Sequence, residues 1–160
     1  MSKEEEKLYP EIKEWLQNYL TDKYKGHTVE TTFETSRRNL DVVLKSKGIQ
    51  CKEAIGLQIK VDVVGILKRG DEFKLVFVEV KDTELTLKDL GQLWGYTQLI
   101  DPIESLLVSS KGLGRLSHLF NVLRREDVLK FGTKTNKFMQ IAKWDKVRSC
   151  IDYSSLTPKI

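Results

Sequence analysis

Little in the sequence points to an extracellular, membrane-bound or redox-active protein. Its two cysteines, Cys51 and Cys150, lie far apart and show no paired spacing, which argues against a zinc knuckle or a disulfide framework. We expect two reduced thiols, as is usual in cytosolic proteins. No apolar run follows Ser2-Lys3-Glu4, so no secretory signal is expected, and no apolar run approaches the roughly 18 residues of a membrane-spanning helix. We therefore expect a cytoplasmic protein that does not contact membranes.

Several common catalytic signatures are also missing. The chain has no Walker loop, no dinucleotide-binding fingerprint and no nucleophile elbow. His27 and His118 are isolated and fall in no metal-ligand or catalytic-triad spacing, so we assign them no role. The chain has 160 residues, which is enough for one domain but short for two, and we expect residues 1–160 to form a single domain.

Charge is unevenly distributed along the chain. The net charge is +4, yet residues 111–148 contain ten Lys or Arg against three acidic residues. The part before residue 111 therefore carries an excess of acids. An acidic part beside a basic part suits a site that collects cations next to a surface that collects phosphates. A solvated basic surface would give the same pattern.

Hydrophobic periodicity predicts an α/β fold with a central mixed β-sheet and helices on both faces. Apolar residues at helical spacing from Leu8 to Leu20 indicate an opening helix of about four turns that ends before residue 25. Thr86 is the expected N-cap of a second helix. Residues 36–56 show no clear pattern. The other expected elements are strands at 28–35, 57–67, 73–81, 104–109 and 137–144, and helices at 87–100 and 115–124.

The two strands on either side of residues 70–71 form the clearest segment. Gly-Asp at these positions is a typical hairpin turn. A turn there pairs Asp62 with Glu79, and the Cβ atoms of such direct pairs lie about 4.5–5.5 Å apart. It also pairs Lys60 with Lys81. A shift of one residue would turn these side chains to opposite faces.

The two faces of this hairpin differ in character. One is almost wholly apolar and should pack against a helix. The other is apolar near the turn and charged at its open end, where the two acids face each other and the two lysines face each other. Like charges in direct pairs destabilise a sheet; a divalent cation between the acids and a phosphate near the lysines would remove both conflicts. A surface patch of salt bridges is the alternative. The apolar face holds Val61, Val63, Gly65, Leu67, Val76, Val78 and Val80.

An Asp in one strand followed by Glu-x-Lys in the next resembles the PD-(D/E)XK nuclease superfamily. Here these elements are Asp62 and Glu79-Val80-Lys81, while Val61 stands where the leading Pro of the motif would be. The following helix is similar to the Gln-x-x-x-Tyr motif of the RecB-like branch. In this chain the motif is Gln92 and Tyr96, which share a helical face with Lys88.

The start of the chain resembles the small, archaeal-type nucleases of this class. These begin with a Glu three residues before Leu-Tyr-Pro. Here, Glu5 stands three residues before Leu8-Tyr9-Pro10. Glu5 falls on the apolar face of the expected helix, where a carboxylate is poorly placed unless it has a partner. Glu11 is the second candidate. The likeness covers about residues 1–110, the expected catalytic core, and leaves a basic C-terminal part at about 111–160.

The resemblance implies a restriction-endonuclease-like fold and a nuclease that hydrolyses phosphodiester bonds with Mg²⁺ or Mn²⁺. Hard cations of this kind prefer carboxylate oxygens. Asp62 and Glu79 would be the metal ligands, the Val80 carbonyl would contribute, and Glu5 would reach the metal through water. Lys81 would orient the attacking water or stabilise negative charge.

The remaining expected roles concern the substrate, for which we expect DNA. Gln92 would act at the catalytic site, and Tyr96 would help to position the nucleic acid, with plain helix packing as the alternative for Tyr96. A homodimer would allow both strands to be cut. Two other readings stay open: an inactive nucleic-acid-binding module with a nuclease-like fold, and a basic protein adaptor with a chance Glu-x-Lys. The expected phosphate contacts, each of which is otherwise an ordinary surface charge, are Lys60, Lys88, Lys111, Arg115, Arg124 and Arg125.

Overall fold

A six-stranded mixed sheet forms the centre of the protein, as predicted. The structure is a computed structural model that describes residues 2–159. The strand order is β1-β2-β3-β4-β7-β8; β4 runs parallel to β3 and β7, and the other neighbours are antiparallel. The strands are β1 (Thr28–Thr32), β2 (Val63–Arg69), β3 (Glu72–Lys81), β4 (Glu104–Ser109), β7 (Gln140–Asp145) and β8 (Cys150–Thr157). A separate pair consists of β5 (Lys130–Phe131) and β6 (Lys137–Phe138).

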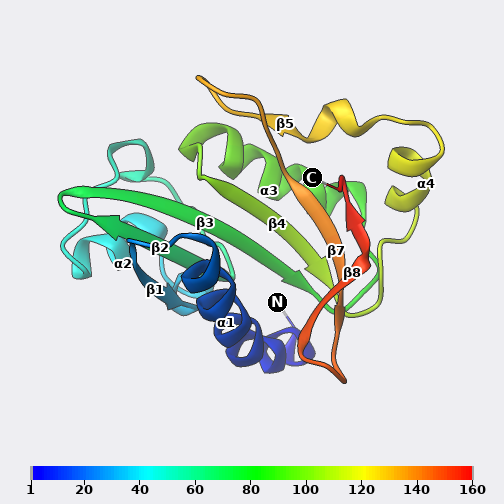
Figure 1. Ribbon diagram of the computed structural model, residues 1–160, viewed down its shortest axis with the longest axis horizontal. Coiled ribbons are helices and arrows are strands. Elements are labelled where there is room, and N and C mark those ends of the chain that lie inside the picture. The colour runs from blue at the N-terminus through cyan, green and yellow to red at the C-terminus, as the bar shows by residue number, and fades with distance from the viewer. Residues whose placement is uncertain (1, 160) are drawn as a thin grey trace.

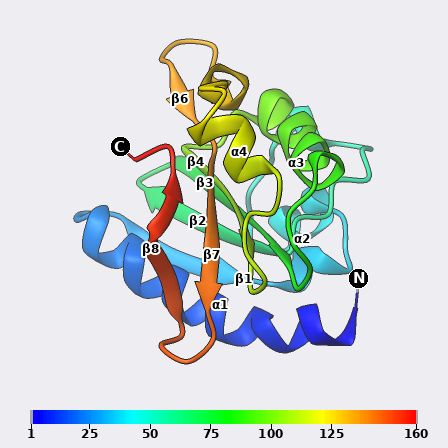
Figure 2. The same cartoon turned by 90° about the vertical axis from the view of Figure 1, so that its right-hand side faces the viewer.

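Helices cover both faces of the sheet, which confirms the predicted fold class. α1 (Lys3–Lys23) crosses one face, and α3 (Leu87–Ile100) lies on the other (Figures 1 and 2). No helix within residues 2–159 is long and apolar enough to cross a bilayer. The shorter helices are α2 (Leu40–Ser46), α4 (Leu116–Asn121) and the 3₁₀ turns η1 (Glu34–Ser36), η2 (Lys52–Ala54) and η3 (Glu126–Leu129).

α1 is longer than predicted because it begins at Lys3. Ser2 caps the helix, because its hydroxyl oxygen accepts a hydrogen bond from the Glu5 N–H over 3.1 Å. Pro10 lies inside the helix, where it cannot donate to the carbonyl four residues earlier. The helix nevertheless forms because its apolar stripe is buried against the sheet, and burial of such a stripe outweighs local propensity. The stripe consists of Leu8, Ile12, Leu16 and Leu20.

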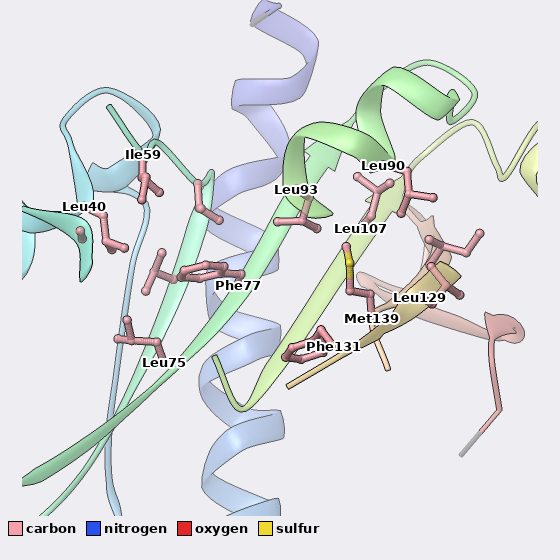
Figure 3. Packing of buried hydrophobic residues seen from close by; sticks show 14 of the residues in the cluster. Leu40, Ile59, Leu75, Phe77, Leu90, Leu93, Leu107, Leu129, Phe131 and Met139 are labelled. Atoms are coloured by element: carbon pink, nitrogen blue, oxygen red, sulfur yellow. The ribbon is translucent and has the colours of Figure 1, made fainter. Parts of the chain in front are cut away.

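The opposite face of the sheet carries the larger core cluster. Phe77 of β3 and Leu107 of β4 pack there against Leu93 of α3 (Figure 3). Leu40 of α2 and Ile59 pack at one side of the cluster. Both faces of β3 are therefore covered, and polar side chains can lie beside this strand only where they have partners.

The predicted hairpin register is confirmed, but the predicted start of its first strand is wrong. Val63 pairs with Val78, which places Asp62 next to Glu79. The ladder stops at Val63, whereas a strand from residue 57 was expected. The chain bends at Asp62, so Val61 joins the core on the α3 side and not the apolar face that packs on α1. The reason lies in the hydrogen bonds of the two acids, described below.

Smaller errors of the prediction occur at the other elements. The expected strand at 28–35 ends at residue 32, the helix at 115–124 shortens to α4, and the strand at 137–144 divides into β6 and β7. β8 was not predicted at all. Its sequence lacks clear alternation. In the structure, Ser154 and Ser155 hydrogen-bond locally to Asp152, and the β7–β8 ladder is irregular between Ile141 and Lys143.

The close approach of α1 to β2 generates a prediction at Gly65. A Cβ added there would lie 2.5 Å from Cδ1 of Leu20, which is fully buried and has little room to move. We expect Gly65→Ala to lower the free energy of unfolding by about 1–3 kcal/mol, as overpacking does. Urea denaturation measures this.

The matched control is Gly91→Ala in α3, where an added Cβ meets nothing within 4 Å. This change should stabilise the protein by up to about 1 kcal/mol, because Ala favours a helix over Gly. Equal stability of wild type and Gly65→Ala would contradict the packing of α1 on β2.

Candidate active site

Two acidic side chains are buried together where β2 begins and β3 nears its end. Asp62 is 8% exposed and Glu79 is 5% exposed. The N-terminal turns of α1 lie at the same end of the sheet (Figure 1), and Ser2 Oγ donates to Asp82 Oδ1 over 3.1 Å just after β3. The predicted pair of acids is therefore brought together, away from bulk water.

The two carboxylates accept main-chain N–H groups at the open end of the hairpin, and the bond from the Val80 N–H takes the place of a ladder hydrogen bond. The Asp62 N–H donates to Glu79 Oε1 over 3.1 Å, and the Val80 N–H donates to Asp62 Oδ2 over 2.8 Å. Tyr9 donates its hydroxyl to Asp62 Oδ1 over 2.9 Å. These bonds fix the Asp62 carboxylate from two sides and end the β2–β3 ladder, which explains the bend before Val63.

Tyr9 is a residue of this site that the sequence analysis missed. It is 2% exposed and lies on the buried side of α1. Its position four residues after Glu5 places both side chains on one helical face. That spacing, in a helix with an otherwise aliphatic buried stripe, was the available signal.

The electrostatics of Glu79 follow from its burial. Desolvation raises the pKa of this carboxyl well above its ordinary value, and the charge of Asp62 and a side-chain hydrogen bond between the two acids raise it further, against the opposing effect of Lys81. Glu79 therefore keeps its proton to a higher pH than a solvated glutamate would.

Glu5, on α1, lies near Asp62 and Lys81. It is 8% exposed, and burial raises the pKa of its carboxyl, with Lys81 opposing and Asp62 adding to the rise. The positive charge that acts most on this carboxyl is the Lys81 ammonium, although no ion pair between Glu5 and Lys81 forms among the described residues. Glu11, the second candidate, is not at the site, because it accepts the indole N–H of Trp144 over 2.5 Å.

Lys81 stays charged at this position. Burial alone would lower the pKa of its ammonium, but the surrounding negative charges outweigh this effect and raise the pKa. Its Nζ lies 4.0 Å from Asp89 Oδ1. The structure confirms Thr86 as the N-cap of α3, and Asp89 forms a capping box with it. The charges that act on Lys81 are those of Glu79, Glu5, Asp62 and Asp89.

Among the described residues, no hydrogen bond or ion pair joins Gln92, Lys88, Tyr96 or Lys60 to the acids. Gln92 and Lys88 are exposed on α3. Tyr96 is half-buried and packs against the core cluster, in line with the packing alternative. Lys60 is exposed and precedes the strand, so the predicted ladder pair between Lys60 and Lys81 does not form.

The basic C-terminal candidates are surface residues. Lys111, Arg115 and Arg124 are exposed. Arg125 is exposed too, but it forms a two-point ion pair with Asp127, at 2.9 Å and 3.1 Å. A phosphate contact by Arg125 would have to compete with this carboxylate.

The donor set can be tested against the expected metal. Between residues 2 and 159 there is no group of three or more His, Cys, Asp or Glu side chains placed to hold a metal ion. Mg²⁺ commonly takes one or two carboxylates and completes its shell with water and phosphate oxygens. Asp62 and Glu79 fit this requirement as a pair, whereas Glu5 does not join them in a three-residue ligand set.

The raised pKa of Glu79 predicts a pH-dependent effect of Glu79→Gln on stability. Above pH 4.5, the ordinary carboxyl value, Glu79 loses its proton in the unfolded chain but keeps it in the folded protein. Wild-type stability should then fall as pH rises toward the folded-state pKa. In EDTA, Glu79→Gln should exceed wild type in free energy of unfolding at neutral pH, and the difference should vanish below pH 4.5.

Chemical denaturation across this pH range measures the difference. Glu72→Gln, an exposed glutamate on the same strand, is the matched control and should leave the pH profile unchanged. A pH-independent difference between Glu79→Gln and wild type would show that Glu79 is not held as an acid in the folded protein.

Comparison with known proteins gives no relative. A scan against protein-family models, a search of curated proteins and a search of solved structures each returned no match. The function of this chain is therefore inferred from the geometry of Asp62, Glu79 and their neighbours.

Proposed function

We propose that this protein is a Mg²⁺- or Mn²⁺-dependent nuclease that hydrolyses phosphodiester bonds, with DNA as the expected substrate. One observation carries the proposal: Asp62 and Glu79 are buried side by side at the end of the sheet, next to a charged Lys81. Two adjacent buried acids cost folding free energy unless a proton or a cation lies between them. Carboxylate oxygens are the ligands that Mg²⁺ prefers.

Each residue has a role that follows from its contacts. Asp62 and Glu79 would hold the cation, which supplies a water of lowered pKa and a Lewis acid for the phosphate. Tyr9 and the Val80 N–H keep the Asp62 carboxylate oriented, as outer-shell partners do in metal sites. Lys81 is positively charged and only half-buried, so it can stabilise the charge that develops on the phosphate.

The substrate would approach from the exposed side of this end of the sheet. Lys60, just before Asp62, and Lys88, in the first turn of α3, are exposed cations close in sequence to the site residues. The basic segment 111–148 would add phosphate contacts farther from the cleaved bond. A homodimer that cuts both strands remains part of the proposal.

One observation favours a second candidate function. The absence of a three-residue metal-ligand group within residues 2–159 suits a protein that holds nucleic acid without cutting it. In that case the proton on the acid pair would be permanent, and Lys81 would bind a phosphate without hydrolysing it. The same experiment separates the two functions.

The test is metal-dependent cleavage of linear, circular and branched DNA and of single strands. Wild type should cut with Mg²⁺ or Mn²⁺ and not with EDTA. Glu79→Ala should abolish cleavage, and Lys81→Ala should reduce the rate by about 10²-fold or more, as loss of a charge-stabilising donor does. The matched controls are Glu72→Ala and Lys74→Ala, exposed residues of the same strand, which should cut like wild type.

Two results would contradict the proposal. If wild type binds these substrates but cuts none of them, the nucleic-acid-binding function takes its place. If Glu79→Ala and Lys81→Ala cut as fast as wild type, the cleavage comes from another site or a contaminant.

A further inference from the structure

A pocket of about 450 Å³ lies beside the candidate active site, between the start of α1 and the turn after β1. This volume falls within the range of about 300–1,000 Å³ that is common for small-ligand sites. Its lining combines aromatic and charged side chains. The residues that bear on its function are Tyr9, Phe33, Arg37, Arg38, Glu6 and Glu34.

Tyr9 lines this pocket and also contacts the acid pair. Its hydroxyl donates to Asp62, and its ring lies 6.1 Å from the ring of Phe33, centroid to centroid, with the planes tilted by 45°. β1 ends on the same side, because Thr32 pairs with Val64. A ligand in the pocket would therefore be a near neighbour of Asp62.

Phe33 offers an open aromatic surface. The Phe33 side chain is 37% exposed, although one side of its ring faces the buried ring of Tyr9. The turn that carries it is fixed, because the Phe33 carbonyl accepts the Ser36 N–H over 3.1 Å and the Ser36 hydroxyl over 2.7 Å. A partly exposed aromatic ring on a fixed turn is the kind of surface on which nucleic-acid bases stack.

Arg37 and Arg38 place two guanidinium groups at the same pocket. Arg37 Nη2 lies 3.1 Å from Glu6, and Arg38 Nη1 lies 3.8 Å from Glu34. Both arginine side chains are mostly exposed, and exposed ion pairs of this kind contribute little to stability. Each guanidinium has five N–H donors, so most of them remain available for a phosphate.

We infer that this pocket binds one unpaired nucleotide of the substrate, with its base stacked on Phe33 and its phosphate held by Arg37 and Arg38. The inference rests on the proposed function, because it places the neighbouring phosphate of the same strand at Asp62 and Glu79. A base inside a duplex is covered by its neighbours and cannot stack on a protein ring without leaving the helix. The substrate class is therefore DNA with a single-stranded stretch beside the cleaved bond.

The test is equilibrium binding in EDTA, where nothing is cut. A fluorescent single-stranded oligonucleotide and the same strand in a blunt duplex are titrated with wild type, Phe33→Leu and Arg37→Ala. Phe33→Leu keeps an apolar side chain against Tyr9 but removes the aromatic face. It should weaken single-strand binding by about tenfold, within the range for loss of one stacked base, and leave duplex binding unchanged. Arg37→Ala should weaken single-strand binding and reduce its salt dependence.

Two matched controls lie elsewhere on the surface. Tyr153→Leu removes an exposed aromatic ring on β8, and Arg69→Ala removes an exposed arginine at the end of β2. Both should bind the single strand like wild type. Unchanged single-strand affinity of Phe33→Leu, or an equal loss on single strand and duplex, would overturn the inference.

The outcome is independent of cleavage. If wild type does not cut but Phe33→Leu loses single-strand affinity selectively, the pocket stands and the nuclease proposal fails. If wild type cuts and Phe33→Leu binds and cuts single strands like wild type, the nuclease proposal stands and the pocket fails.

Discussion

At the open end of the β2–β3 hairpin, the Asp62 carboxylate takes over a hydrogen bond that a longer ladder would have made between main chains, and the Glu79 carboxylate accepts a second N–H beside it. Glu79 accepts the Asp62 N–H, and Asp62 accepts the Val80 N–H. The chain before Asp62 is thereby free to leave the sheet, and the Ile59 carbonyl instead accepts the N–H of Leu40 at the start of α2 over 2.8 Å. The acid pair, the bend and the placement of α2 thus depend on one exchange of hydrogen bonds.

The part of the structure that depends on local pattern could be predicted from the sequence. The turn at residues 70–71 and the alternation around it allow one register in which both faces are covered, and that register places Asp62 beside Glu79. α3 and β4 match their predicted ranges. Thr86 caps the start of α3, and Asp101-Pro102 ends this helix shortly before β4 begins. The mixed sheet with helices on both faces follows from the order of these elements.

Other features could not be predicted because they arise from contacts between distant segments. The strand start at Val63 depends on side-chain hydrogen bonds that form only when the acids meet. Tyr9 becomes part of the site through a contact across 53 positions of sequence. β8 has no clear alternating pattern and is held by its pairing with β7. The separation of Lys60 from Lys81 follows from the bend.

The central claim is that the buried acid pair exchanges its proton for a divalent cation, and calorimetric titration of the wild-type protein with Mn²⁺ at neutral pH tests it most directly. Metal sites release protons when their ligands must be deprotonated, and comparing buffers of different ionisation enthalpy measures that release. We expect wild type to bind Mn²⁺ with net release of protons, and Asp62→Asn not to bind it. Absence of binding, or equal binding by Asp62→Asn, would contradict it.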